Sequence, residues 1–406
     1  MNLLLLFVTS LILATAHGKD KKDHCNCPKC GKEEPNLCKA NMQFAVTLYN
    51  AVSSTTAKAP PNIMFSPFSI SSFLAMLAIG AKSTTRNQIL EGLTLDETQE
   101  DLALNTEYKN LLETLRKQTD KVQVTFGNRF FMQKSTDIVP KYQQDVTRYY
   151  NASMEFVNFN NPQDAASEIN EYVRMRTGGK VRDLVSNLDP YTKLVLADTL
   201  SCKAKLQNPF TQNDIQYEDF TVSQQKTIRV PMLHRVGHYK TYKDKDLHAA
   251  VVEVPMAGDL ILLLIVPKMG YLDKVEQKLT TELIRKYLHK TRTSMLDFYM
   301  PKLTYDGQVN IQCALKSMGM TQMFNDNADL SGISKQSRLK VSNICHKSTF
   351  SISEEEIETR SGSATQTYVK TEAPELKVNR PFLVLVYSED ADTILLMGRV
   401  TDPSAK

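Results

Sequence analysis

Four closely spaced cysteines near the N-terminus form the densest group of reactive side chains in the sequence. The stretch HCNCPKCGKEEPNLC contains Cys25, Cys27, Cys30 and Cys38. Thiolates at such spacings bind zinc in a reducing compartment, whereas disulfides are favoured in an oxidising one. The spacing leaves the pairing open, including a bridge to a partner chain. The other three cysteines lie in regular segments and are predicted to be buried thiols: Cys202, Cys313 and Cys345.

The first residues favour the oxidising compartment. They read MNLLLLFVTSLILATAHGKD, an apolar run followed by small residues at the spacing that signal peptidase prefers. The run is too short to span a membrane, and no later stretch has the apolar length of a membrane helix. We therefore predict a signal peptide over residues 1–16, a secreted, extracellular protein, and a charged, disulfide-bonded extension over residues 17–39. Asn151, in Asn151-Ala152-Ser153, is then a predicted glycosylation acceptor, the alternative being an unused triplet.

A polar segment near the C-terminus, SEEEIETRSGSATQTYVKTEAPE, poses a different question. Its composition favours a linker, because its only large apolar residues are Ile357, Tyr368 and Val369. Directly behind it, NRPFLVLVYSEDADTILLMGRV has two apolar runs joined by a polar turn, which predicts a hairpin of buried strands. A polar stretch just ahead of core strands favours a long functional loop.

Composition and charge exclude several classes of protein. The chain has 406 residues, of which 42% are hydrophobic and 23% charged, enough for one large core or two smaller ones. Its formal net charge of +4 is too mild for a dedicated nucleic-acid binder. Because disulfides are favoured over zinc at the N-terminal cysteines, we expect no metal site, no cofactor, and no nucleic acid or membrane partner.

The elements that position these segments can be read from hydrophobic periodicity. The globular part is predicted to start at Ala40, where ANMQFAVTLYNAV has the apolar face of a helix. NIMFSPFSISSFLAMLAIG predicts a short strand and then a buried helix, and TKLVLADTLSCKAKL predicts a central strand. Residues 229–310 are predicted to be mostly strands. Helices and strands do not alternate strictly, so we expect an α+β domain over residues 40–406 with largely antiparallel or mixed sheets.

Five stretches resemble the serpin family: NIMFSPFSISSFLAMLAIGAKSTTRNQILEGL, EYVRMRTGGKVRDLV, MGMTQMFNDNADLSGIS, VSNICHKSTFSISEEE and the C-terminal NRPFLVLV…ILLMGRVTDP. They occur in the family's order and are most similar to its secreted, antitrypsin-like branch. The resemblance implies three β-sheets, eight or nine helices and an exposed reactive loop at about residues 354–375. In inhibitory members a serine protease cleaves this loop, which then inserts into the large sheet and traps the acyl-enzyme. Such a protein is a suicide substrate, so it is not an enzyme and has no catalytic residues.

The resemblance also implies a reactive bond between Lys370 and Thr371. A lysine there would fill the anionic specificity pocket of a trypsin-like serine protease, which is the protease class we predict as the partner. The alternative is that Lys370 is simply a solvated loop charge. Arg360 is a second candidate cleavage site, and cleavage that far upstream would disable an inhibitor.

Insertion requires that alternate residues of the loop enter a packed interior. On the family register the inward side chains are small or β-branched: Ile357, Thr359, Ser361, Ser363, Thr365 and Thr367. The hinge, comprising Glu354, Glu356, Ile357 and Thr359, departs from the family pattern, because inhibitory members carry a flexible glycine at the position of Glu356. This departure favours the alternative function, a non-inhibitory serpin that binds a ligand or a protein.

Two other departures lie in the predicted large sheet. Leu206 replaces the family's buried tryptophan at the top of the sheet, and Asp198 replaces an asparagine of the central shutter. The other shutter residues implied by the resemblance are Ser66, Ser69 and His346. An Asp–His pair there could titrate and alter opening of the sheet. The alternative is a satisfied, buried hydrogen-bond network.

A basic segment, RKYLHKTR, is a candidate heparin site. It contains Arg285, Lys286, Lys290 and Arg292, and in some serpins the equivalent helix binds sulfated glycosaminoglycan. The alternative is a solvated basic helix face.

A last hypothesis is a structural protein assembled through disulfide-linked partners at Cys25, Cys27, Cys30 and Cys38.

Overall fold

The computed structural model describes residues 36–54, 61–98, 100–116, 119, 121–179, 181–210, 214–335, 339–353 and 373–405, and it is built around one fully buried helix. This helix, α2 (Pro67–Gly80), exposes only part of Ile79. Its N-cap is Ser66, whose side chain accepts a hydrogen bond from the Ser69 N–H, and Pro67 occupies the first helical position, where no N–H is needed. The sequence prediction of a buried helix here is confirmed.

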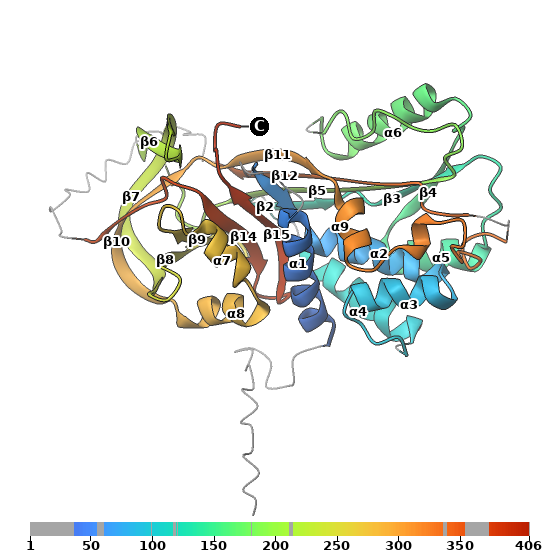
Figure 1. Cartoon of the computed structure of the whole chain (residues 1–406), viewed down its shortest axis with the longest axis horizontal. Coiled ribbons are helices and arrows are strands. Elements are labelled where there is room, and N and C mark those ends of the chain that lie inside the picture. The colour runs from blue at the N-terminus through green and yellow to red at the C-terminus, as the bar shows by residue number, and fades with distance from the viewer. Residues whose placement is uncertain are drawn as a thin grey trace, which may run out of the picture. The chain divides into compact units, whose positions relative to one another are not determined.

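The large sheet has six strands in the order β11-β12-β5-β3-β4, with β2 also paired to β5. The strands are β2 (Val122–Phe126), β3 (Arg129–Gln133), β4 (Ser153–Val157), β5 (Leu194–Lys205), β11 (Thr304–Val309) and β12 (Asn343–Ser353). Strands β5 and β12 are parallel and form an uninterrupted ladder from Asn343 against Val195 to Ser353 against Lys205. Helices cover both faces of this sheet (Figure 1), and β5 is therefore buried along almost its whole length.

The second sheet has nine strands and contains the predicted C-terminal hairpin. Its strands are β1 (Ile63–Phe65), β6 (Ile215–Ser223), β7 (Lys226–Asp244), β8 (Ala249–Pro255), β9 (Leu260–Pro267), β10 (Arg292–Pro301), β13 (Glu375–Lys377), β14 (Phe382–Ser388) and β15 (Thr393–Val400). Long strand β7 pairs with β6 through its first residues and with β8 through its last. Three sheets were expected, whereas the described strands form two, because the long strand β7 carries the pairing continuously from β6 to β8.

The described residues contain nine α-helices. Besides α2 they are α1 (Asn36–Ser54), α3 (Ser83–Gly92), α4 (Asp101–Leu115), α5 (Pro140–Tyr150), α6 (Pro162–Arg176), α7 (Leu272–Gln277), α8 (Thr281–Lys290) and α9 (Ile311–Ser317), together with the 3-10 helix η2 (Gln322–Phe324). None of the described helices combines the length and the apolar content needed to cross a bilayer. The predicted α+β class is confirmed.

Helix α6 lies alone on one face of the six-stranded sheet, opposite α2, α3, α4 and α5 (Figure 1). It packs there through its own small core, which includes Ile169 and Val173 from the helix and Phe131 and Val195 from the sheet. The helix ends before Gly178 and Gly179, whose φ values of 59° and 79° are left-handed and suit glycine.

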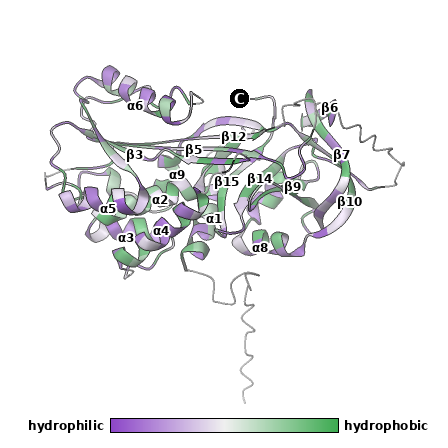
Figure 2. Ribbon diagram, turned by 180° about the vertical axis from the view of Figure 1, so that it is seen from behind, coloured by the Kyte–Doolittle hydropathy of each residue, from purple (hydrophilic) through white to green (hydrophobic). Residues whose placement is uncertain are grey.

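Figure 2 shows that the strongly apolar strands, such as β14 and β9, lie in the interior.

Candidate functional site

The two ends of the predicted reactive loop are anchored on different sheets. Strand β12 ends at Ser353 in the six-stranded sheet, and β13 begins at Glu375 in the nine-stranded sheet. Strand β13 runs parallel to β10, with Glu375 opposite Asp297. The predicted reactive bond and hinge lie outside the described residues: Lys370, Thr371, Glu354, Glu356, Ile357 and Thr359. Their roles stay predictions.

The C-terminal anchor is held by side chains as well as by the ladder. The Lys377 ammonium lies 3.2 Å from Glu218 Oε2 and 4.5 Å from the centroid of the Tyr299 ring. Tyr299 in turn stacks on His234, with ring centroids 4.0 Å apart. These contacts hold β13, the strand that follows the predicted loop, against the nine-stranded sheet.

The structure brings together the four side chains that the resemblance assigned to the shutter, and we call them, with Asn128, the seam network. His346 on β12 is the ladder partner of Asp198 on β5, and Ser66 and Ser69 come from the N-terminal turn of α2. Ser66, Ser69, Asp198 and His346 are completely buried. The seam between β5 and β12 is therefore bridged by side chains as well as by backbone.

Hydrogen bonds fix the tautomer of His346. The Ser66 N–H donates to Nε2 of His346 at 3.0 Å, so this nitrogen must carry a lone pair. The proton is then on Nδ1, which lies 2.7 Å from Oδ2 of Asp198 and donates to it. A doubly protonated ring would place an N–H against the Ser66 N–H. The hydrogen bonds are those of a neutral imidazole beside a carboxylate. Both ring nitrogens of His346 have a partner, as in the predicted buried hydrogen-bond network.

The network extends to Asn128, which sequence reasoning missed. The Ser69 hydroxyl contacts the second oxygen of Asp198 and lies 3.3 Å from Oδ1 of Asn128. The Asn128 amide donates to the Ser72 hydroxyl at 3.3 Å. Its only sequence signal was a Gly-Asn pair between two short strands. No buried side-chain nitrogen or oxygen of the seam network lacks a hydrogen-bond partner, which avoids the cost of burying an unsatisfied group.

Leu206 follows the last residue of β5 and forms an isolated bridge with Met256, which follows the last residue of β8. Its side chain is buried and lines a cavity of about 260 Å³, together with Lys205, Gln207 and Met256. The resemblance implies a tryptophan at this position in the family. A leucine fills less volume than a tryptophan would at this position.

Only some of the cations in the basic segment are available to bind a polyanion, because others already form ion pairs. Helix α8 places Arg285 3.6 Å from Oδ2 of Asp392, and Lys286 2.9 Å from Oδ2 of Asp244. The hydrogen bond to Asp244 raises the pKa of Lys286. Arg292 is exposed but donates to the carbonyls of His289 and Thr291. Lys290 is exposed at the helix C-terminus.

The cysteines behave differently from one another. Cys202 is buried, as predicted, and Cys345 is half-buried, whereas Cys313 is exposed, so the prediction of a buried thiol was wrong there. The reason is that α9 buries Ile311, Ala314 and Leu315 on one face and turns Cys313 outward. Cys38 lies inside α1 with its thiol directed at the Ala391 carbonyl, 3.6 Å away.

We expect the free thiols Cys313 and Cys345 to differ in reactivity. Burial raises the pKa of Cys345 to about 11, so at pH 8 almost no thiolate is present and access is restricted. A maleimide added to the native protein should label Cys313 within minutes and leave Cys345 unlabelled until the protein is unfolded. Mass mapping of the labelled peptides measures this, with Cys313→Ser as the control. Equal labelling of both thiols in the native protein would contradict the burial of Cys345.

Comparison with known proteins places these features in context. The sequence profile described as Serpin (serine protease inhibitor) matches residues 39–403. Serine protease inhibitor A6 of Xenopus laevis is 34% identical over 394 residues, 96% of this chain and 89% of the relative. Alpha-1-antiproteinase of Bos taurus is 34% identical over 376 residues, 92% of this chain and 89% of the relative. The solved structure of human thyroxine-binding globulin complexed with thyroxine is similar with a TM-score of 0.84 and 28% identity, covering 91% of this chain and 99% of that one.

Proposed function

The chain belongs to the serpin family, and from that premise we propose that it is a secreted suicide-substrate inhibitor of trypsin-like serine proteases, cleaved between Lys370 and Thr371. The family is described as serine protease inhibitors, and its inhibitory members act without catalytic residues of their own. Secretion would follow from a signal peptide over residues 1–16. The inhibitory mechanism requires the cleaved loop to enter the six-stranded sheet.

The observation that carries the proposal is the β5–β12 ladder. The predicted loop leaves the sheet directly from β12, so a loop that folds back runs antiparallel to β12. Since β5 is parallel to β12, the inserted strand is antiparallel to both. Insertion would therefore replace one parallel pairing by two antiparallel ones, which are slightly more stable per residue. The sheet as it stands has no strand between β5 and β12, as expected of an inhibitor before cleavage.

The alternation of the loop sequence supports the same step. The side chains that would face the interior, from Ile357 to Thr367, are small or β-branched and uncharged. The charged residues Glu356, Glu358 and Arg360 would face the opposite side of the strand. The pattern therefore permits burial of one loop face without burying a charge.

The test is incubation of the protein with trypsin. We expect a covalent complex that survives denaturing electrophoresis, accompanied by cleaved protein, because Glu356 slows entry of the hinge and lets some acyl-enzyme hydrolyse. Mass spectrometry identifies the cleaved bond. Cleavage at Lys370 without complex, and without a gain in heat resistance, would reject the inhibitor.

A non-inhibitory ligand carrier is the second candidate function. It is supported by Glu356 at the hinge and by the similarity to thyroxine-binding globulin, which was solved with thyroxine bound. Such a protein would be cleaved by trypsin as an ordinary substrate. The same incubation therefore separates the two candidates.

Modification and assembly are further parts of the proposal. Asn151 is exposed and caps α5 in the left-handed conformation, with φ of 51°, so an oligosaccharide could be attached there without unfolding the helix. Cys25, Cys27 and Cys30 would form disulfides within the extension or with a partner chain. Non-reducing electrophoresis of the secreted protein distinguishes these two pairings.

We also propose that sulfated glycosaminoglycan contacts the end of α8 through Lys290 and Arg292. Arg285 and Lys286 are ion-paired with Asp392 and Asp244, so their charges are already compensated. Replacing Lys290 and Arg292 with alanine should lower the salt concentration that elutes the protein from immobilised heparin, because two exposed charges are lost.

The matched control for this heparin test replaces two other exposed lysines, Lys134 and Lys193, which lie at the ends of strands in the six-stranded sheet. This control has the same change in net charge. If both double variants shift elution equally, heparin retention reflects net charge alone, and the α8 site is rejected.

A further inference from the structure

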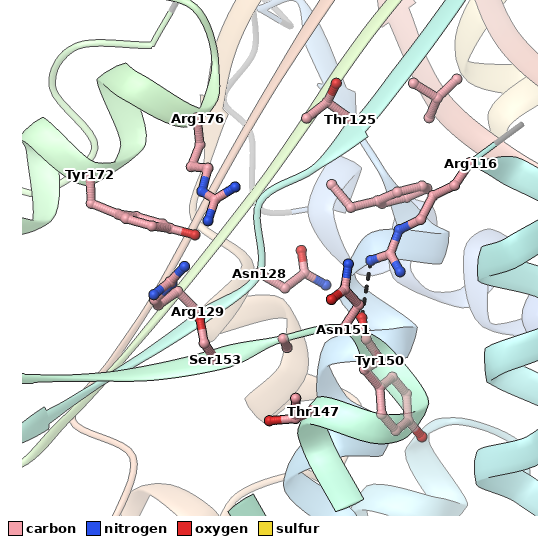
Figure 3. A pocket seen from close by; sticks show the side chains of 13 residues that line it. Arg116, Thr125, Asn128, Arg129, Thr147, Tyr150, Asn151, Ser153, Tyr172 and Arg176 are labelled. Carbon is pink, nitrogen blue, oxygen red and sulfur yellow. Dashed lines mark hydrogen bonds between the residues drawn. The ribbon is translucent and has the colours of Figure 1, made fainter. Parts of the chain in front are cut away.

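A cavity of about 370 Å³ opens where α5, α6 and strands β2, β3 and β4 approach one another. Figure 3 shows three arginines around it: Arg116 just after α4, Arg129 at the start of β3 and Arg176 at the end of α6. Polar side chains from the strands and loops complete the lining, among them Asn128 and Asn151. We call this cavity the arginine pocket. Its volume falls in the usual range for small-molecule sites, about 300–1,000 Å³.

The charge of the arginine pocket is one-sided. None of its described lining residues is acidic. Arg176 is exposed at the mouth of the pocket, and its guanidinium lies 5.6 Å from the centroid of the Tyr172 ring. No ion pair is found for Arg176 within the part of the chain that the structure describes. A concave surface with one sign of charge concentrates ions of the opposite sign.

Arg129 is the most constrained of the three arginines. Only 6% of the residue is exposed, and its guanidinium stacks 4.0 Å from the centroid of the Tyr172 ring. One terminal nitrogen pairs with Glu155, which is itself half exposed. The Nε–H of Arg129 is buried without a hydrogen-bond partner in the described structure. A buried donor without an acceptor destabilises the fold, and a bound acceptor would remove that cost.

Arg116 is also in an unfavourable environment for a cation. Burial lowers its pKa, an effect that the nearby charge of Glu113 offsets in part. One terminal nitrogen donates to the Tyr150 carbonyl at 3.0 Å, which orients the guanidinium beside the pocket. Figure 3 shows that bond and shows Asn128 lying between Arg116 and Arg129. Three guanidinium groups from three different elements thus border one polar cavity.

We propose that the arginine pocket binds a small, hydroxylated organic anion through a phosphate or sulfate group. Arginine forks match the oxygens of such groups and can bind them in a bidentate manner. The oxyanion would lie between Arg129 and Arg176, where it accepts the unpartnered Nε–H. The amide of Asn128 and the hydroxyls of Thr125 and Ser153 suit the hydroxyl groups of the remaining ligand. This site is separate from the reactive loop, and its occupancy does not depend on inhibition.

The test is calorimetric titration of the whole protein, produced without N-glycans so that no sugar on Asn151 covers the mouth. The probes are glucose 6-phosphate, glucose 6-sulfate and uncharged glucose. We expect saturable one-to-one binding of one or both esters and none of glucose. The stronger of the two esters identifies the preferred oxyanion. Binding of glucose as tight as that of the esters, or no binding of either ester, would overturn the proposal.

Three variants tie the binding to the pocket. Arg176→Gln, at an exposed position, should weaken binding of the better ester at least tenfold. Arg174→Gln is the matched control, because Arg174 is on the same helix but pairs with Glu171, and it should leave the affinity unchanged. Arg129→Met should also weaken binding, with circular dichroism reporting whether the variant folds. Unchanged affinity in Arg176→Gln, or equal losses in Arg176→Gln and Arg174→Gln, would reject the site.

Discussion

Replacing Lys370 with alanine should abolish both the covalent complex with trypsin and cleavage at this bond. The trypsin-like specificity pocket buries a carboxylate, and a substrate without a cation leaves that carboxylate unpaired. Loss of one partner of a buried, hydrogen-bonded charge pair costs about 2–5 kcal/mol, which corresponds to a roughly 30-fold to 5,000-fold slower reaction. The measurement is the second-order rate of trypsin inactivation, with electrophoresis to separate complex from cleaved protein.

Lys370→Arg is the control for this prediction, because it keeps the positive charge and should retain complex formation. Inactivation by Lys370→Ala at the rate of the unchanged protein would mean that the reactive bond lies elsewhere, for example after Arg360. Both substitutions leave the described residues untouched, so a change in folding is not expected.

The hinge should decide how much of the acyl-enzyme is trapped. Trapping requires insertion to outrun deacylation, and Glu356 lacks the backbone freedom of glycine and must keep its carboxylate hydrated. Glu356→Gly should therefore raise the ratio of complex to cleaved protein without changing the cleaved bond. A ratio that stays the same would show that the hinge does not limit insertion.

Replacing Asp198 with alanine should markedly destabilise the protein, whereas replacing it with asparagine should not. In Asp198→Ala the Nδ1–H of His346 loses its acceptor in a fully buried site. An unsatisfied donor there costs about 1–3 kcal/mol, and the deleted side chain adds a cavity. Because this bond crosses the seam between β5 and β12, the loss should also ease separation of these strands.

Asparagine can satisfy the same site by reorienting two hydrogen bonds. Its Oδ1 accepts from His346, its amide donates to the Ser69 hydroxyl, and that hydroxyl turns to Asn128 Oδ1, already 3.3 Å away. Urea unfolding of the two variants beside the unchanged protein measures the difference. If Asp198→Asn is as unstable as Asp198→Ala, the negative charge itself, not the hydrogen-bond count, stabilises the seam.

Local patterns in the sequence were enough for the secondary structure and the family. The buried helix α2 is specified by an unbroken apolar run behind a Ser-Pro cap, and the β14–β15 hairpin by two apolar runs around a polar turn. Hydrophobic periodicity and caps act over a few residues, so they can be read without knowing the rest of the chain. The stretches that resemble serpins added the sheet arrangement, which periodicity alone does not give.

Only the tertiary structure decided which distant side chains meet. The resemblance already placed His346 near Asp198, 148 residues away, but the register of β12 against β5 set their hydrogen bond, and only the folded chain brought Asn128 to them. The partners of the α8 cations, Asp244 and Asp392, come from β7 and from the turn of the C-terminal hairpin. The arginine pocket likewise joins the ends of α4 and α6 to β3. Such pairings depend on strand register and helix packing, which no local sequence pattern encodes, so charge compensation and pocket formation emerge only when the chain is folded.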